Sequence, residues 1–183
     1  MKRILSILTI FACFSSFAQN EFELKTNDEG KVFYQDVIKA DSSSLDELMD
    51  KALSLFKTGK EKVTSEDRKL GIIKAETELT TKGQRPDKSK EYFYTFSYEI
   101  TLEFKDGKVR YTFANFKKKS SPGEPGSTLE AFIDSYNPVI SSESTRAKAA
   151  QRLDTMEIAI QDHIDNTIVR LKDTFDPSDD SDW

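Results

Sequence analysis

The sequence predicts an α+β protein in which an antiparallel sheet of about five strands carries helices on one face, including a long C-terminal amphipathic helix. Two observations support this fold class. Apolar and polar side chains alternate over residues 91–116, as in a β-hairpin, and two other segments repeat apolar side chains at helical spacing. We therefore expect the order β-α-β-β-β-β-α, with the helices on the apolar sheet face and the other face partly exposed to water.

The hairpin is the best-specified element. Its first strand places apolar side chains at alternate positions from Tyr92 to Phe104. Asp106-Gly107 follows, and this dipeptide suits a type I′ turn because both central residues need φ > 0. A two-residue turn then pairs Lys105 with Lys108, Phe104 with Val109, Glu103 with Arg110, Leu102 with Tyr111, Thr101 with Thr112, and Ile100 with Phe113. This register matches apolar with apolar and acid with base, so a one-residue slip would disturb both faces.

The segments before the hairpin alternate between strand and helix patterns. Ser44 and Glu47 have the spacing of a capping box, in which each side chain accepts from a free backbone amide of the other residue. The apolar stripe that follows predicts a helix, and Gly59 is placed to end it as a C′ residue. The remaining predictions are strands over 31–40, 62–65 and 70–80, a turn over 66–69 and an exposed loop over 82–90.

After the hairpin, residues 117–128 carry three lysines, serines and two proline-containing turns, which indicates a break in regular structure. A short helix is predicted over 129–136 and a long one over 144–175. The long helix has an apolar stripe of Leu153, Met156, Ile160, Ile164, Ile168, Leu171 and Phe175. We expect this stripe to pack on the sheet, because it has to be covered.

Residues 1–18 have the features of a secretory signal peptide. Lys2 and Arg3 precede an apolar run, and Ala18 ends a segment suited to signal-peptidase cleavage. Cys13 is the sole cysteine and offers an alternative, lipid-anchored route, which Phe11 fits poorly. Cleavage after Ala18 leaves a chain without cysteine and changes the formal net charge from −5 to −7. Such acidity disfavours nucleic acid as a partner.

The predicted organisation is therefore a signal peptide at 1–18, a flexible lead-in at 19–30, an α+β domain at 31–119, a loop at 120–128, helices packing on the domain at 129–175, and an acidic disordered tail at 176–183.

Three stretches carry a resemblance to a known family: KVFYQDVIKADSSSLDELMDKALSLF, LGIIKAETEL and YEITLEFKDGKVRYTFANF. They resemble exported bacterial domains of unknown function that are described as TBP-like, meaning similar in fold to the TATA-binding protein. The resemblance covers about residues 31–119 and implies a fold and an export route, but no agreed activity. It does not imply DNA binding, since Glu76, Glu78, Glu99 and Glu103 lie on the sheet face that would hold DNA.

Few residues suggest chemistry. His163 is the only histidine and lies near Asp162 and Asp165, so it is either a general base or ligand, or a boundary residue of an amphipathic helix. A single histidine does not make a His-rich metal site. The acidic tail lacks the central glycine and final glutamate of an EF-hand loop. We therefore predict no catalytic residue, no metal site and no cofactor.

Phe93 is an aromatic residue on the polar face of the hairpin. Together with Ile72 it could begin an exposed apolar patch, and Arg110 lies on the same face. These three residues form the candidate binding surface. The alternative is that Phe93 is an isolated surface aromatic.

The sequence thus favours a non-catalytic binding or accessory module that is exported to the periplasm or secreted. Its partner would be an unknown protein or envelope component, with neither nucleic acid nor a transmembrane span expected. It would act through the uncovered sheet face, a strand edge or the long helix. Two alternatives remain open: a hydrolase whose site includes His163, and a structural subunit that self-associates through the final helix.

Overall fold

The computed structural model describes residues 24–40, 43–83, 92–105, 107–120, 125–136 and 143–176. The predicted signal peptide lies outside these residues, as do 84–90 of the predicted loop and 177–183 of the predicted tail. In chain order the elements are β1 (Tyr34–Lys39), α1 (Leu45–Thr58), β2 (Lys62–Asp67), β3 (Ile72–Gly83), β4 (Tyr92–Lys105), β5 (Lys108–Lys118), β6 (Ser127–Thr128), α2 (Leu129–Tyr136) and α3 (Glu143–Phe175).

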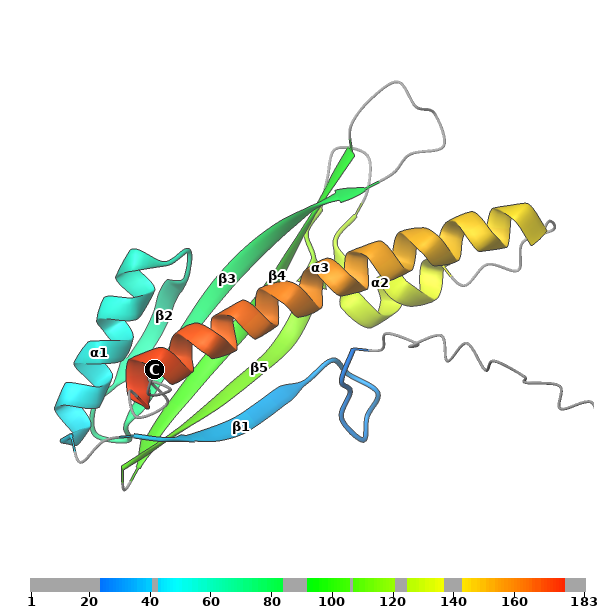
Figure 1. The fold of residues 1–183 in the computed structure, drawn as a ribbon. Coiled ribbons are helices and arrows are strands. Elements are labelled where there is room, and N and C mark those ends of the chain that lie inside the picture. Colours follow the sequence, from blue (N-terminus) through cyan, green and yellow to red (C-terminus); the bar gives the residue numbers. More distant parts are fainter. Residues whose placement is uncertain are drawn as a thin grey trace, which may run out of the picture.

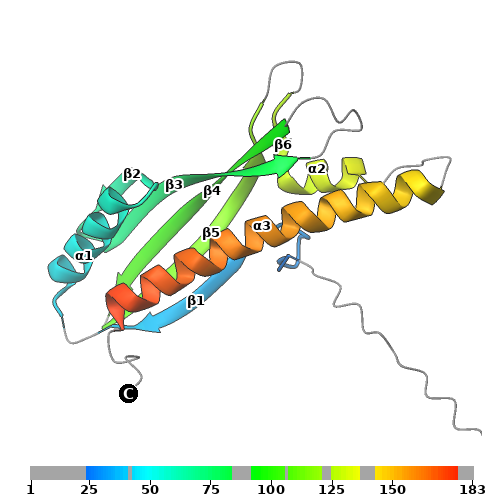
Figure 2. The same ribbon diagram turned by 45° about the horizontal axis from the view of Figure 1, so that its top comes forward.

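The strands form one antiparallel sheet in the order β1-β5-β4-β3-β2, and the two-residue β6 pairs with the end of β5. The predicted α+β class is therefore confirmed, with β6 as an additional strand in the segment expected to be a loop. Figures 1 and 2 show α3 crossing one face of the sheet, with α1 beside β2 and α2 near the opposite end. Burial alternates along β3, where Ile73, Ala75 and Leu79 are buried while Lys74 and Glu78 are exposed. One sheet face is therefore apolar and covered, and the other is polar.

The predicted hairpin register is confirmed at every pair from Lys105 with Lys108 to Ile100 with Phe113. Gly107 has φ 68°, as the turn requires. Farther from the turn the register shifts between Ser97 and Glu99, and Asn115 adopts φ 58°. The extra residue on β5 is a β-bulge, and it turns Phe116 rather than Asn115 toward the core.

The capping box of α1 is confirmed: the Glu47 amide donates to Ser44 Oγ at 3.3 Å, and the Ser44 amide donates to Glu47 Oε2 at 2.8 Å. Gly59 ends the helix but is not the left-handed C′ residue expected, since its φ is −90°. A larger residue there would have to displace the ends of two side chains. A Cβ at position 59 would lie 1.8 Å from Glu61 Oε2 and 2.5 Å from Arg170 Nη2.

Two further sequence predictions need correction. Residues 24–30 of the predicted flexible lead-in form a small turn in which Thr26 bridges Val32 and Leu24 is buried. Strand β2 continues to Asp67, so the turn between β2 and β3 lies later than the predicted 66–69. Gly71 is the last residue before β3 and has φ 64°. The Gly71 carbonyl accepts from the Phe104 amide at 2.8 Å, which fixes this turn to β4.

The apolar stripe of α3 packs against the sheet and its neighbouring helices. Met156, Ile160, Ile164, Leu171 and Phe175 are buried. Phe175, the last helical residue, contacts Phe104 edge to face, with ring centroids 5.8 Å apart. The helix also contacts α1 and α2. Among the described residues, no helix is both long and apolar enough to cross a membrane.

Replacing Ile164 with alanine should lower the free energy of unfolding by about 3 kcal/mol, because this fully buried side chain leaves a cavity against the sheet. Ile158 lies on the same helix but is 43% exposed, so Ile158→Ala should change stability by no more than about 0.5 kcal/mol. Chemical denaturation of both variants checks this. Equal losses would show that α3 does not complete the core.

Candidate functional site

A groove of about 790 Å³ lies at the turn end of the β4–β5 hairpin. We call it the hairpin-end groove. Its lining comes from the start of α1, the β2–β3 turn, the end of the hairpin and β1: Val37, Ser43, Leu45, Leu48, Lys69, Leu70, Glu103, Phe104, Lys105, Gly107, Lys108 and Arg110. Four separate parts of the chain therefore build this groove.

Exposed apolar side chains gather in the hairpin-end groove. Val37 is 49% exposed, Leu45 39% and Leu70 70%. These are three of the six large apolar side chains most exposed among the described residues. Apolar side chains scattered singly over a surface need no explanation, but several on the walls of one groove indicate a surface that binds something.

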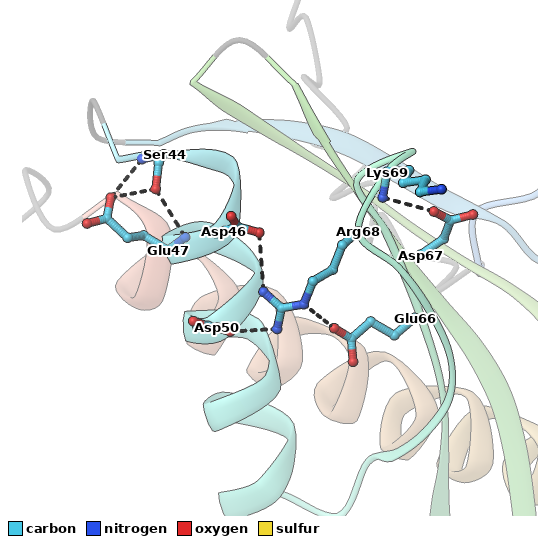
Figure 3. Close-up of polar contacts among 8 residues, drawn as sticks. All are labelled: Ser44, Asp46, Glu47, Asp50, Glu66, Asp67, Arg68 and Lys69. Atoms are coloured by element: carbon cyan, nitrogen blue, oxygen red, sulfur yellow. Dashed lines mark hydrogen bonds and ion pairs between the residues drawn. The ribbon is translucent and has the colours of Figure 1, made fainter.

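An ion-pair network holds two walls of the groove together (Figure 3). The Arg68 guanidinium contacts Glu66 at 2.6 Å, Asp50 at 2.7 Å and Asp46 at 3.3 Å. These hydrogen bonds raise the pKa of Arg68, which stays charged. Arg68 lies in the β2–β3 turn while Asp46 and Asp50 lie on α1, so the network sets the position of α1 relative to this turn.

The turn itself is fixed by Asp67. Its Oδ1 accepts from the backbone amides of both Lys69 and Leu70 at 3.0 Å. Figure 3 shows Asp67 beside the amide of Lys69. This side chain satisfies two amides of the turn, so Leu70 sits at a defined position although its side chain is 70% exposed.

The charged residues that line the groove are mostly basic: Lys69, Lys105, Lys108 and Arg110 against the single acid Glu103. The Arg110 Nε donates to Glu103 Oε2 at 2.7 Å, which lowers the pKa of Glu103 and raises that of Arg110. Lys69 and Lys108 make no ion pair with other residues of the described ranges. The groove is thus a positively charged site on a chain whose net charge is −5.

The structure brings together only part of the predicted binding surface. Ile72 pairs with Glu103, Glu103 with Arg110, and Arg110 with Val37, so these residues form one row across the open sheet face. All of them except Ile72 line the groove. Phe93 is 50% exposed but lies ten positions along β4 from Glu103, about 33 Å away at the rise of a strand. Phe93 and Ile72 do not form one contiguous patch, which agrees with the alternative that Phe93 is an isolated surface aromatic.

Between these two ends, the open sheet face is polar. Glu76 pairs with Glu99, and Lys74 and Thr101 lie in the next pair. Within the described part of the chain, this face has no large exposed apolar side chain between Ile72 and Phe93. The middle of the sheet is therefore not an apolar binding surface.

A second polar site lies where α1 ends and β2 begins. The Glu61 side chain is only 2% exposed and accepts from Arg170 Nη1 of α3 at 2.7 Å. Arg170 also donates to the Leu55 carbonyl at 3.4 Å near the end of α1. This ion pair joins α3 to the end of α1, and its side-chain ends occupy the space beside Gly59. No pattern in the sequence indicates this ion pair, since its partners are 109 residues apart.

His163 lines a shallow pocket beside this ion pair, together with Glu61, Arg170 and residues 58–60. Its Nε2 is buried without a hydrogen-bond partner among the described residues. The ring lies edge to face with Tyr98, at 5.8 Å between centroids. Burial lowers the pKa of His163, with Lys60 and Arg170 acting in the same direction and Glu61 opposing them. His163 is thus neither alone on an open helix face nor bonded to a nucleophile.

The groups around His163 are poorly suited to acid–base chemistry. The carboxylate of Glu61 is held by Arg170, and burial raises the pKa of the Tyr98 hydroxyl to about 12. A nucleophile–base pair at hydrogen-bond distance is not found around this histidine in the described residues. Across the same ranges, no three His, Cys, Asp or Glu side chains are placed to hold a metal ion.

Residues 34–119 match the model of a family described as a domain of unknown function (DUF4468) with TBP-like fold. This stretch of the chain is similar to that family, and the expected TBP-like fold is confirmed. No curated protein matches the chain.

Two crystal structures resemble the whole fold. A DUF4468 family protein from Bacteroides ovatus has a TM-score of 0.61 at 14% identity, over 84% of this chain and 90% of that one. A TBP-like protein from Parabacteroides distasonis has a TM-score of 0.51 at 12% identity, over 80% of this chain and 96% of that one. At such identities the likeness extends to the fold alone.

Replacing Arg170 with methionine should lower the free energy of unfolding by about 2 kcal/mol, because it leaves the buried Glu61 carboxylate uncompensated. The double variant Glu61→Gln/Arg170→Met should be more stable than Arg170→Met alone. Arg68→Met is the matched control, since Arg68 is similarly exposed but its carboxylates are in water, and its loss should be clearly smaller. A larger loss for Arg68→Met in denaturation experiments would contradict this assignment.

Burial of His163 predicts a pH dependence. With a lowered pKa in the folded protein, the unfolded chain takes up the proton first, so stability should fall as pH drops through about 6.5 and level off below the folded pKa. His163→Gln should flatten this part of the stability curve. Below about pH 4.5 the variant should still lose stability, because carboxylates such as Glu103, whose pKa is lowered in the folded protein, then become protonated. Melting temperatures across pH 4 to 8 test this, and an unchanged curve for His163→Gln would refute it.

Proposed function

We propose that this protein is an exported, non-catalytic binding module of the cell envelope that holds a partner protein or envelope component in the hairpin-end groove. The observation that carries the proposal is the gathering of Val37, Leu45 and Leu70, all exposed, on the walls of one basic groove. Support for export comes from residues 1–18, with Lys2 and Arg3 before an apolar run.

The groove is favoured over the other surfaces considered. The middle of the open sheet face is polar, and its acids disfavour nucleic acid. The apolar stripe of α3 is used within the fold, which weakens the idea of a subunit that self-associates through this helix. The hydrolase alternative retains one supporting observation, the shared pocket of His163, Glu61 and Arg170. The Glu61–Arg170 ion pair weighs against it, because the carboxylate is already engaged.

A photo-crosslinking experiment tests the proposal. Residues 19–183 contain no cysteine, so Leu70→Cys gives a single attachment point for a benzophenone maleimide in the groove. Val169→Cys is the control, because Val169 is 54% exposed on α3. Illumination with separate envelope and cytosolic fractions of a bacterium that makes the protein should give a discrete adduct from Leu70→Cys and the envelope fraction only.

The specificity of this adduct is checked by competition. Unlabelled native protein should suppress it, and unlabelled Leu70→Asp should not. Fractionation of the same cells should place the protein itself in the envelope or outside the cell. Adducts of equal yield from positions 70 and 169, or the protein in the cytosol, would count against the proposal.

A further inference from the structure

The charges around the groove point to the chemistry of its partner. Lys105 and Lys108 are directly paired on β4 and β5, and Arg110 lies two positions along from Lys108 on the same sheet face. That separation is about 7 Å, which equals the spacing of alternate side chains along an extended peptide. Lys69, in the β2–β3 turn, also lines the groove. Cations from two parts of the chain therefore line the groove, and those on β5 are spaced at an interval that suits an extended chain.

Apolar side chains share the lining of the groove with these cations. Leu45 and Leu70 line the walls with Val37, while Leu48 and Phe104 are only 2% and 4% exposed. A ligand with anionic groups alone would leave this apolar surface in water. A ligand with apolar groups alone would bury Lys69 and Lys108 without a negative charge beside them. The lining fits a chain that alternates carboxylates with apolar side chains.

A flat anionic membrane suits the same residues less well. The groove is concave, and beside it lie the carboxylates of Asp46, Glu47 and Asp50 on α1. These acids would face the headgroups of an approaching bilayer and repel them.

We infer that the hairpin-end groove binds an extended acidic peptide segment of another protein, in which carboxylates flank one or two apolar side chains. This inference rests on the proposed function and names the class of its partner. The carboxylates bind Lys69, Lys108 and Arg110, and the apolar side chains cover Leu45, Leu70 and Val37. Because opposite charges attract over about 10 Å at moderate salt, binding weakens as ionic strength rises.

The test uses residues 19–183 and a fluorescein-labelled peptide, Gly-Asp-Leu-Asp-Glu-Leu-Asp-Gly, followed by fluorescence anisotropy. Two control peptides replace all acids by their amides, or both leucines by serine. Each control should bind at least about tenfold more weakly, which is a change of one decade in Kd. Raising the salt from 50 to 300 mM should weaken binding of the acidic peptide and leave the amide peptide nearly unchanged.

Protein variants locate the site. Lys108→Glu and Leu70→Ser should each weaken binding about tenfold. Their controls are Lys117→Glu, an exposed lysine at the other end of β5, and Val169→Ser on α3, which should stay within about twofold of the native protein. Circular dichroism confirms that the variants fold, as expected for exposed positions. Equal losses in variants and controls would overturn the location of the site.

Other outcomes overturn the partner class. Equal binding of the acidic and amide peptides would exclude recognition of carboxylates. Stronger, Leu70-dependent binding to phosphatidylglycerol vesicles would make the partner a membrane surface. Residues 177–183 carry three aspartates and Trp183. If deletion of these residues tightens peptide binding at high salt as well as at low salt, the occupant is this chain's own tail.

The two proposals fail separately. A specific crosslink at position 70 without any binding of the acidic peptide would leave the binding module intact and overturn only the acidic class. Failure of both the crosslink and the peptide would remove the groove as a binding site.

Discussion

The structure depends on covering one face of the β4–β5 hairpin. That face carries a run of aromatic and aliphatic side chains that includes Tyr98, Ile100 and Phe113, and burying them supplies much of the stability of a domain of this size. Among the described helices, α3 alone is long enough to lie across it, and its buried stripe runs from Met156 to Phe175. Because the described helices cover this face, the other face is mostly charged and polar.

The hairpin-end groove lies beyond the point where α3 stops covering the hairpin. Phe175, the last residue of α3, packs on Phe104, and the hairpin continues beyond that contact to its turn at Gly107. The start of α1 and the β2–β3 turn flank this projecting end without burying it. Arg68 and Asp67 then fix these flanking segments by polar contacts at the surface. Exposed Leu70 and Leu45 are thus held in place by charges rather than by a core.

At the far end of the hairpin, one inserted residue changes which side chains of β5 are buried in the core. The bulge at Asn115 advances the alternation of β5, so that Phe116 and Lys118 face inward. Phe116 stacks on Tyr98 at 4.7 Å, and Lys118 lies over the rings of Tyr94 and Phe132. The ammonium group of a buried lysine is stabilised there by aromatic faces. The three-residue step from Phe113 to Phe116 was a signal in the sequence that simple alternation overlooks.

What the sequence determined by itself is local. Alternation and Asp-Gly define the hairpin register, Ser44 and Glu47 define the start of α1, and the apolar spacing of 153–175 defines the face that α3 buries, because each pattern acts over a few residues. The tertiary structure alone decided the rest. It set β1 beside β5, joined Glu61 to Arg170, separated Phe93 from Ile72 and gathered Val37, Leu45 and Leu70 in one groove. These relations link segments far apart in the chain, and they follow from which surfaces fit together, which no local pattern encodes.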